Sequence, residues 1–449
     1  MIRLRFALAV LVLLIPATPA LAQNFDFDAR RIAMGATGNG DNAAQNMVQR
    51  DPVYASIVLP FGLIQIWNNR HIFDPNAPEY NPVLAMEYAA SPIHLMFNRN
   101  EGDTSGPFVN ALAKGVVSRD LNTYRGFLLA ASIDGDGMVA PHWGGTIKGK
   151  TRADGSFQGV YVGAGPYFAI DTKLNTDERL SALLASTTPV YLPNATLAIS
   201  NLTDNQFAGA ITAGYRARFA LPVSAPGKRD GIYVAANYNY LYGFRYDNYA
   251  IGIRIDTDAS GLITVLPNTA AITAVHTAAT SGHGYAIDLG ASVVSGGWEF
   301  GFGASGVANR INWSDFTQDT YTLGNLISGS HFAHTQGTPL TDTKEVKLPV
   351  RSTGNVSYTT KKASIDVELS HGLQDTIFNG GLEYRMKALA LRGGGRHVRS
   401  DWHATGGVGL NMGPRVAFDV AAYGTAANLE RHEKLALAMS IRINAKPKK

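Results

Sequence analysis

Residues 434–444 read KLALAMSIRIN, and this stretch sets the interpretation of the whole chain. Every second position is apolar, and the positions between are mostly small or polar; the apolar set is Leu435, Leu437, Met439, Ile441 and Ile443. Side chains alternate between the two faces of a β-strand, whereas a helix repeats about every 3.6 residues. The stretch therefore predicts a strand with one apolar face. Its length matches the roughly 9–11 residues with which a tilted strand crosses a bilayer.

The same alternation recurs upstream, with acidic residues on the second face only. In residues 363–369 the apolar positions alternate with Asp366 and Glu368, and in residues 416–421 they alternate with Asp419. A buried sheet in a soluble protein would have to neutralise these carboxylates. A membrane barrel directs them into a wet lumen and presents the apolar row to lipid. The fold class predicted is all-β, a transmembrane antiparallel β-barrel.

The chain begins with a basic and then strongly apolar segment, MIRLRFALAVLVLLIPATPALAQ. Basic residues, an apolar run and a small-residue site in this order predict a signal peptide over residues 1–22. Residues 23–50 are rich in Gly and Asn, and we expect them to form an N-terminal plug or hatch segment. Residues 51–449 are predicted to form the barrel with long extracellular loops. The expected location is the bacterial outer membrane.

Alternation and turn residues divide the rest of the chain into about fourteen strands, an even number as bacterial barrels require. The predicted strands are 125–134, 157–170, 206–220, 231–243, 246–256, 283–294, 297–307, 346–358, 362–369, 378–386, 389–397, 402–411, 414–423 and 434–444. Residues 52–66 form either a first strand or a packed plug element. The long gaps at 171–205, 257–282 and 308–345 are predicted extracellular loops, with a short helix at 177–186. The tyrosines from Tyr238 to Tyr246 are expected at a strand end, as an interfacial girdle.

Composition excludes several kinds of chemistry. The chain contains no Cys, so disulfides, thiolate catalysis and Cys-based metal sites are excluded. Its formal net charge is only +4, which argues against a general nucleic-acid binder. The 47 glycines and 10% aromatic residues suit short strands, tight turns and interfacial rings.

Three short motifs have better structural than chemical explanations. The glycines of residues 301–306 match a dinucleotide fingerprint on paper, but they alternate with Phe inside a strand pattern. Asp134 and Asp136 resemble half a calcium loop, although a hairpin turn fits them better. His331 and His334 are more consistent with a surface loop than with a metal site. The sequence thus predicts a protein that is not an enzyme and has no cofactor and no metal.

The stretch from residue 348 to residue 443 resembles a known family. LPVRSTGNVSY, KASIDVELS, GGLEYRMKALALRGGGR, ATGGVGLNMG, RVAFDVAAYG and KLALAMSIRI follow the order seen at the C-terminal end of FadL-like outer-membrane barrels. The nearest branches are the conjugal-transfer TraF-like and the secretion PorV-like proteins, and DARRIAMGATG near the N-terminus is similar to the same superfamily. The resemblance implies a barrel of about 14 strands with an N-terminal hatch in the lumen.

Charged residues on the polar face are the candidate functional residues. The predicted lumen-lining set is Arg216, Arg218, Arg245, Arg254, Asp366, Glu368, Glu383, Arg385, Arg392, Asp419 and Arg442. They either set pore selectivity, hold the plug through ion pairs, or simply line the wet interior; their mixed sign argues against a strong ion filter. The predicted plug residues are Arg30, Arg31, Gly35, Gly38 and Gly40, with Arg30 and Arg31 expected to meet Asp366, Glu368 or Asp419.

Two functions remain open at this point. The first is a channel for hydrophobic or small solutes that is closed by the plug. The second is a non-transporting barrel that serves as a structural partner of a conjugation or secretion apparatus. The expected partners are outer-membrane lipid, together with hydrophobic small molecules in the first case and secretion or conjugation components in the second.

Overall fold

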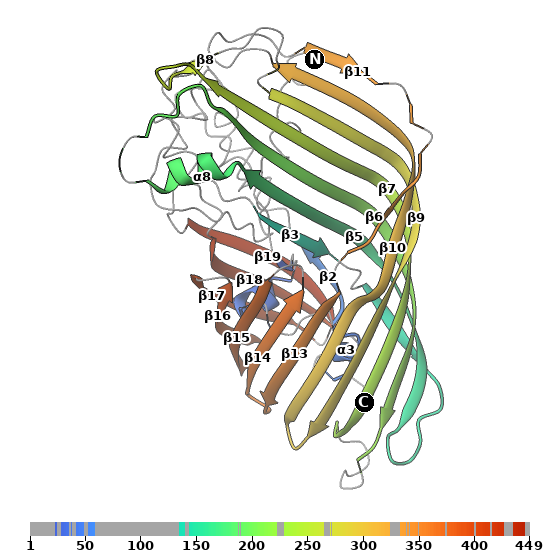
Figure 1. Ribbon diagram of the computed structural model, residues 1–449. Coiled ribbons are helices and arrows are strands. Elements are labelled where there is room, and N and C mark those ends of the chain that lie inside the picture. Colours follow the sequence, from blue (N-terminus) through green and yellow to red (C-terminus); the bar gives the residue numbers. More distant parts are fainter. Residues whose placement is uncertain are drawn as a thin grey trace.

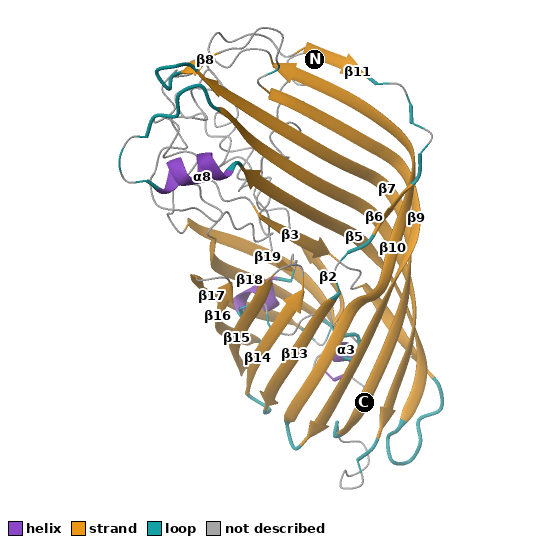
Figure 2. Cartoon of the chain, viewed as in Figure 1, coloured by secondary structure: helices purple, strands orange, loops and turns teal. Residues whose placement is uncertain are grey.

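A single sheet dominates the structure, a computed structural model shown in Figures 1 and 2. It describes residues 23–24, 28–35, 37, 42–48, 53–58, 134–139 and most of 143–444, with gaps at 187, 189, 222–228, 265–269, 271, 324–332, 338, 341, 349, 373–374, 399–400, 414 and 426–433. The predicted signal peptide and all but the last residue of the predicted strand 125–134 lie outside these residues. Among the described residues, no helix has the length and apolar character needed to cross a membrane.

The first half of the described chain holds three short helices and the longest strands. Its elements are β1 (Gln23–Asn24), α2 (Ala29–Ala33), α3 (Gln45–Val48), β2 (Val53–Val58), β3 (Asp134–Val139), β4 (Trp143–Lys148), β5 (Phe157–Thr176), α8 (Glu178–Ala185), β6 (Thr196–Phe219), β7 (Gly231–Thr257), β8 (Ile263–Thr264), β9 (Ile272–Ser295) and β10 (Trp298–Leu323). The second half consists of shorter strands. They are β11 (Ala333–Gln336), β12 (Lys344–Val346), β13 (Arg351–Thr359), β14 (Ala363–Gly372), β15 (Asp375–Met386), β16 (Leu389–Val398), β17 (Asp401–Met412), β18 (Val416–Thr425) and β19 (Lys434–Asn444).

Neighbouring strands pair antiparallel in one series. From β2 the series runs through β19 and back in order to β13, then through β10, β9, β7 and β6 to β5, which pairs with β3 and β4. Only the two-residue pairing of β1 with β3 is parallel among the described ladders. The sheet curves so that α2 lies on its concave side (Figure 1). The predicted all-β antiparallel fold is confirmed, and no described ladder joins β2 to β3, β4 or β5.

The strands β14 to β19 lie where the sequence predicts them, and β19 has the predicted limits. The first part of residues 52–66 is strand β2, paired with β19. The predicted short helix is also present as α8, where the Asp177 carboxylate accepts the backbone N–H of Arg179 at 2.9 Å. Hydrogen bonds from the side chain and backbone of Arg179 lower the pKa of Asp177.

The prediction of two strands at 231–243 and 246–256 is wrong, because both belong to β7. Phe207 pairs with Arg245 and Ala208 pairs with Gly243, so Phe244 is an extra residue in a β-bulge. A second irregularity, between Ala304 and Ala308, interrupts the ladder of β10 with β9. These bulges shift the alternation without a turn, which explains why the sequence pattern breaks there. The tyrosines 238–246 accordingly lie in the middle of a strand and not at its end.

The predicted loops are also partly wrong. β5, β6, β7, β9 and β10 continue through much of 171–205, 257–282 and 308–345. Asp134 and Asp136 lie in β3, opposite β5, and not in a hairpin turn. We call the continuation of these strands past the bulges, together with β11 and β12, the extension.

Outside the extension, and most clearly in strands β13 to β19, the polarity of the sheet is the reverse of that in a soluble protein. We refer to this part of the sheet as the part below the bulges. On β14, Ile365 and Leu369 are 53% and 52% exposed, whereas Glu368 is 1% exposed. Large apolar side chains are likewise exposed on the neighbouring strands: Tyr358, Leu382, Tyr384, Leu391, Val408 and Leu410. Polar and charged side chains are buried on the opposite face, among them Asn355, Glu383, Arg392, Asp419 and Arg442.

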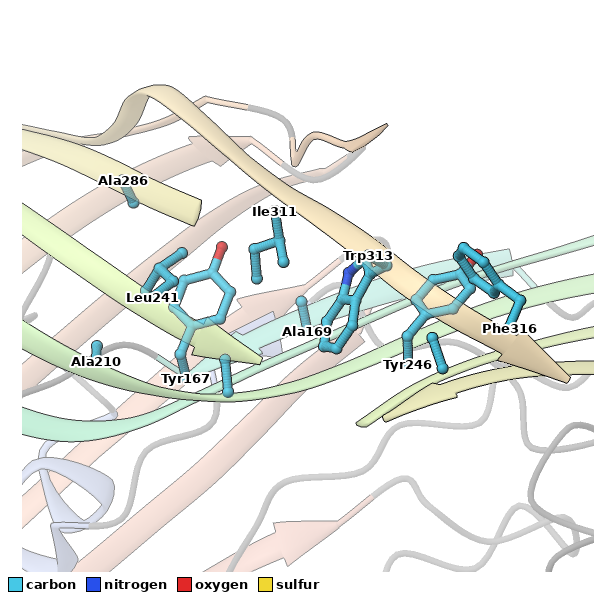
Figure 3. Packing of buried hydrophobic residues seen from close by; sticks show 11 residues of the cluster. Tyr167, Ala169, Ala210, Leu241, Tyr246, Ala286, Ile311, Trp313 and Phe316 are labelled. Atoms are coloured by element: carbon cyan, nitrogen blue, oxygen red, sulfur yellow. The ribbon is translucent and has the colours of Figure 1, made fainter. Parts of the chain in front are cut away.

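In the extension large aromatic side chains are buried, although Leu202 is 44% exposed and polar side chains such as Thr203 are buried there as well. Trp313 and Tyr246 are fully buried, with ring centroids 5.6 Å apart, and Phe316 packs edge-on against Tyr246 (Figure 3). The Trp313 indole N–H donates to Gln206 at 3.1 Å, which satisfies its only polar atom. Leu197, Ile199 and Ile255 are also buried.

We predict that Gly282→Ala destabilises the fold. A Cβ at Gly282 would lie 2.6 Å from Cε3 of Trp313, so the indole would have to move, at a cost of about 1–3 kcal/mol. The matched control is Gly354→Ala, where a Cβ would meet nothing within 4 Å. Denaturant unfolding of both variants measures the difference, and equal stabilities would contradict this packing.

Candidate functional site

Helix α2 lies on the concave face of the sheet, against β16 to β19. The Asp28 carboxylate caps the helix by accepting the backbone N–H of Arg30 at 2.9 Å. Ala29, Ile32 and Ala33 are fully buried against an apolar patch of β18 and β19, formed by Ala421, Tyr423 and Ala438. A helix of this length does not hold itself together in water, so its conformation depends on these contacts.

An ionic network joins this helix to four strands. Arg30 donates from Nε and Nη2 to the two oxygens of Glu383, at 2.9 and 3.1 Å. Arg392 bridges Glu383 at 2.6 Å and Asp419 at 2.7 Å. Arg385 forms a further ion pair with Glu383, with Nε 2.6 Å from Oε1, and Arg442 forms one with Asp419, with Nε 3.0 Å from Oδ2. Burial opposes the charge on Arg30, but the Glu383 carboxylate outweighs burial and raises the pKa of Arg30.

Glycines allow the end of α2 to lie directly on the sheet backbone. We call Gly380, Gly381, Gly394, Gly395 and Gly407 the glycine floor. A Cβ at Gly394 would lie 2.5 Å from the carbonyl carbon of Met34 and 2.6 Å from the nitrogen of Gly35. Gly35 itself has φ +70°, and a Cβ on it would lie 2.5 Å from the carbonyl oxygen of Gly395. Only a residue without a side chain fits at either position.

Two hydroxyl groups fix the backbone of this segment. The Ser440 hydroxyl accepts the backbone N–H of Ala29 at 3.1 Å. The Thr405 hydroxyl accepts the backbone N–H of Gly35 at 2.9 Å and donates to the carbonyl of Ala33 at 3.2 Å. Ser440 is fully buried beneath the helix, so an arginine there would displace α2.

A second contact region lies on the opposite half of the sheet. The Asn42 amide donates to the carbonyl of Ala291 at 3.2 Å and to the Ser292 hydroxyl at 3.0 Å, both in β9. Ala43, Ala44 and Val48 pack against Tyr233, Ala235 and Val294, and Arg229 donates to the carbonyl of Val48. Residues 28–35 thus contact β16 to β19, and residues 42–48 contact β7 and β9.

The structure brings only part of the predicted set together. Glu383, Arg385, Arg392, Asp419 and Arg442 form one network with Arg30. Arg30 pairs with Glu383 and not with the acids expected from the sequence. Asp366 and Glu368 lie together on β14. The side-chain amide of Asn379, on the neighbouring strand β15, donates to the Glu368 carboxylate at 3.5 Å. Gly38 and Gly40 lie outside the described residues.

The other predicted arginines lie apart from this network. Arg216 is buried, with its guanidinium carbon 4.3 Å from the ring centroid of Tyr161, and Arg218 donates to the carbonyl of Gly155 at 3.1 Å. Arg245 and Arg254, both in the extension, are 2.6 and 2.9 Å from Asp247 and Asp256. The predicted selectivity role of the whole set stays a prediction.

Sequence reasoning missed Asn42, Arg229, Thr405, Ser440 and the glycine floor. A signal for the floor is present, because Gly pairs or triplets occur at 380–381, 393–395 and 406–407 in three successive strands. In the ladders, Gly380 pairs with Gly395 and Gly393 pairs with Gly406. No comparable signal marks the two hydroxyl groups, because Ser and Thr are common on wet faces of strands.

Comparison with known proteins gives only distant likenesses. No protein-family model and no curated protein matches the chain. A TodX deletion mutant, a monoaromatic hydrocarbon channel, aligns with TM-score 0.35 and 9% identity over 65% of this chain and 83% of its own. The TodX toluene transporter of Pseudomonas putida aligns with TM-score 0.31 and 10% identity over 78% and 94%. A Rhodopseudomonas blastica porin mutant aligns with TM-score 0.22 and 8% identity over 63% and 100%. At these scores the likenesses carry no argument, and the TraF-like and PorV-like branches stay unconfirmed.

We predict that Gly394→Ala releases α2 from the sheet, while Gly393→Ala does not. The first Cβ would overlap Met34 and Gly35, whereas the second would meet nothing within 4 Å. The two substitutions affect neighbouring residues of one strand and change composition identically. Limited proteolysis of the folded protein should cleave residues 28–48 at least several-fold faster in Gly394→Ala only. Equal cleavage in both variants would mean that the glycine floor does not hold the segment.

Proposed function

We propose that this protein is an outer-membrane β-barrel channel whose interior is occupied by residues 28–48. The observation that carries the proposal is the exposed apolar face of strands β13 to β19, opposite a face on which charged side chains are buried. Below the bulges, apolar side chains are exposed and charges are buried; in the extension, the aromatic cluster is buried. A strand that crosses a membrane presents such an apolar face to lipid, whereas a soluble sheet buries its apolar face.

Strand lengths support the same placement. β14, β16 and β18 have 10 residues each, which matches the roughly 9–11 residues of a tilted membrane strand. β6, β7, β9 and β10 have 24 to 27 residues, so they would continue well beyond the hydrocarbon. The exposed Tyr238, Tyr240, Tyr242 and Phe244 lie just below the bulge, where an interfacial band is expected.

The contacts of residues 28–35 and 42–48 with the sheet support the proposed plug role. A barrel of about fourteen strands encloses more space than its own side chains fill, since about eight strands is where they suffice. The segment takes up part of that space and ties β16 to β19 to β7 and β9. The proposed cargo, hydrophobic or small solutes, comes from the FadL-like resemblance. The structural-partner function remains the alternative, and no described contact favours it.

The membrane placement predicts a strong face dependence of arginine substitutions. Val367→Arg and Leu382→Arg place a charge on the exposed apolar face near mid-strand and should cost about 2–4 kcal/mol each. The control is Ala388→Arg in the turn after β15, where an interfacial charge costs about 0–1 kcal/mol. The three variants are folded into vesicles, and heat-modified gel mobility measures the folded fraction of each. Equal costs for all three variants would contradict the proposed lipid face.

The plug predicts a gain of conductance on deletion of residues 24–50. Removing the segment empties part of the lumen while leaving β2 and all later strands in place, so planar-bilayer conductance should rise severalfold. Heat-modified mobility verifies that the truncated protein is folded. Gly394→Ala provides a second test without truncation, because it should open the channel more often than Gly393→Ala. Unchanged conductance in a folded deletion variant and in Gly394→Ala would assign closure to another segment.

A further inference from the structure

Residues 42–48 dock on the sheet beside a buried carboxylate that has no cationic partner. Glu299, the second residue of β10, is 7% exposed, and its one described hydrogen bond comes from the Asn355 amide at 3.4 Å. None of the ion pairs among the described residues includes Glu299. A buried carboxylate without a positive partner is costly, so this position favours any arrangement that brings a cation to it.

A cation with unused hydrogen-bonding capacity lies close by. Arg229, just before β7, donates from Nη2 to the carbonyl of Val48, the last residue of α3. Its Nε is buried and has no hydrogen-bond partner in the part of the chain that the structure describes. The charges of Arg229 and Glu299 interact electrostatically, although the guanidinium is bound to the plug segment and not to the acid.

The pairing of the strands places these groups on one row of the sheet. Val294 of β9 pairs with Glu299 of β10 on one side and with Gly231 of β7 on the other. Arg229 lies two residues before Gly231. Neighbouring strands are about 4.8 Å apart, so an arginine and a glutamate side chain together can cover this row. Val48 belongs to the same buried cluster as Val294, so the docked segment lies on the row and takes the guanidinium that Glu299 lacks.

The other half of the plug shows no such mismatch. In the network beneath α2, Glu383 has three arginine partners and Asp419 has two. Docking of residues 28–35 thus leaves both carboxylates of that network paired, whereas docking of residues 42–48 leaves Glu299 without a cation.

We propose that residues 42–48 are the movable part of the plug and that Arg229 changes partner when they move. In the docked state its guanidinium binds the Val48 carbonyl; in the released state it pairs with Glu299, while α2 stays on the glycine floor. An ion pair with a carboxylate is stronger than a bond to a neutral carbonyl, so the acid favours release. Apolar packing of the segment favours docking, and these opposing contributions give it two positions. The inference rests on the proposed plug role.

Single cysteines report on the two halves of the plug separately, because the chain contains no native Cys. Val48→Cys and Ile32→Cys each place a thiol at a fully buried position, one in each half. The full-length protein is reconstituted in vesicles and labelled with a water-soluble maleimide. Val48→Cys should react severalfold faster than Ile32→Cys, because only residues 42–48 leave the sheet.

Charge removal tests the exchange of partners. Glu299→Gln keeps the shape of the side chain and removes the competing charge, so labelling of Val48→Cys should slow severalfold while labelling of Ile32→Cys stays the same. The matched control is Glu368→Gln, which neutralises another buried carboxylate of the same face and should change neither rate. In an Arg229→Gln background the effect of Glu299→Gln should be clearly smaller, because the released state no longer offers an ion pair.

Four results would each overturn this inference: labelling of Val48→Cys no faster than that of Ile32→Cys, no slowing by Glu299→Gln, equal slowing by Glu368→Gln, or an undiminished effect of Glu299→Gln in Arg229→Gln. The first comparison leaves Glu299 intact, so it does not depend on how its variants fold. Heat-modified mobility verifies the folding of each variant. The conductance of the folded deletion variant decides the plug role separately.

Discussion

Strand β14 carries apolar side chains on one face and charged side chains on the other. The two faces of this strand therefore require different surroundings. This constraint governs the rest of the structure. The exposed face below the bulges needs an apolar environment, which we propose to be lipid, and the charged face needs polar partners. In the extension the aromatic cluster around Trp313 is buried, while Leu202 remains exposed.

Buried charges also account for the position of the N-terminal segment. Glu383 and Asp419 are almost completely buried, and an unpaired carboxylate there would be costly. Arg385, Arg392 and Arg442 supply partners from the strands, and Arg30 adds a bidentate contact from α2. The glycine floor lets the backbone of α2 come close enough for this contact. Charge and backbone shape thus select the same docking position for residues 28–35.

Much of the fold could be predicted from alternation, and its failures have identifiable causes. Residues 434–444 alternate without interruption, so the limits of β19 are correct. The bulge at Phe244 changed the phase inside one strand, so β7 was divided in two. The extension was predicted only in residues 246–256 of β7, because polar residues such as those of 203–206 hide the alternation in the other strands. The pairing of Arg30 with Glu383 joins residues 353 positions apart, which no local pattern specifies.

The most direct test of the two-environment account is a cysteine scan through residues 365–369 of β14. The chain contains no native Cys, so each substitution carries one fluorophore at a known site. In reconstituted vesicles, a lipid-borne nitroxide should quench probes at positions 365, 367 and 369 strongly and probes at 366 and 368 weakly. A water-soluble quencher should fail to reproduce that order. Uniform quenching along the strand, or strong lipid quenching at 366 and 368, would contradict the account.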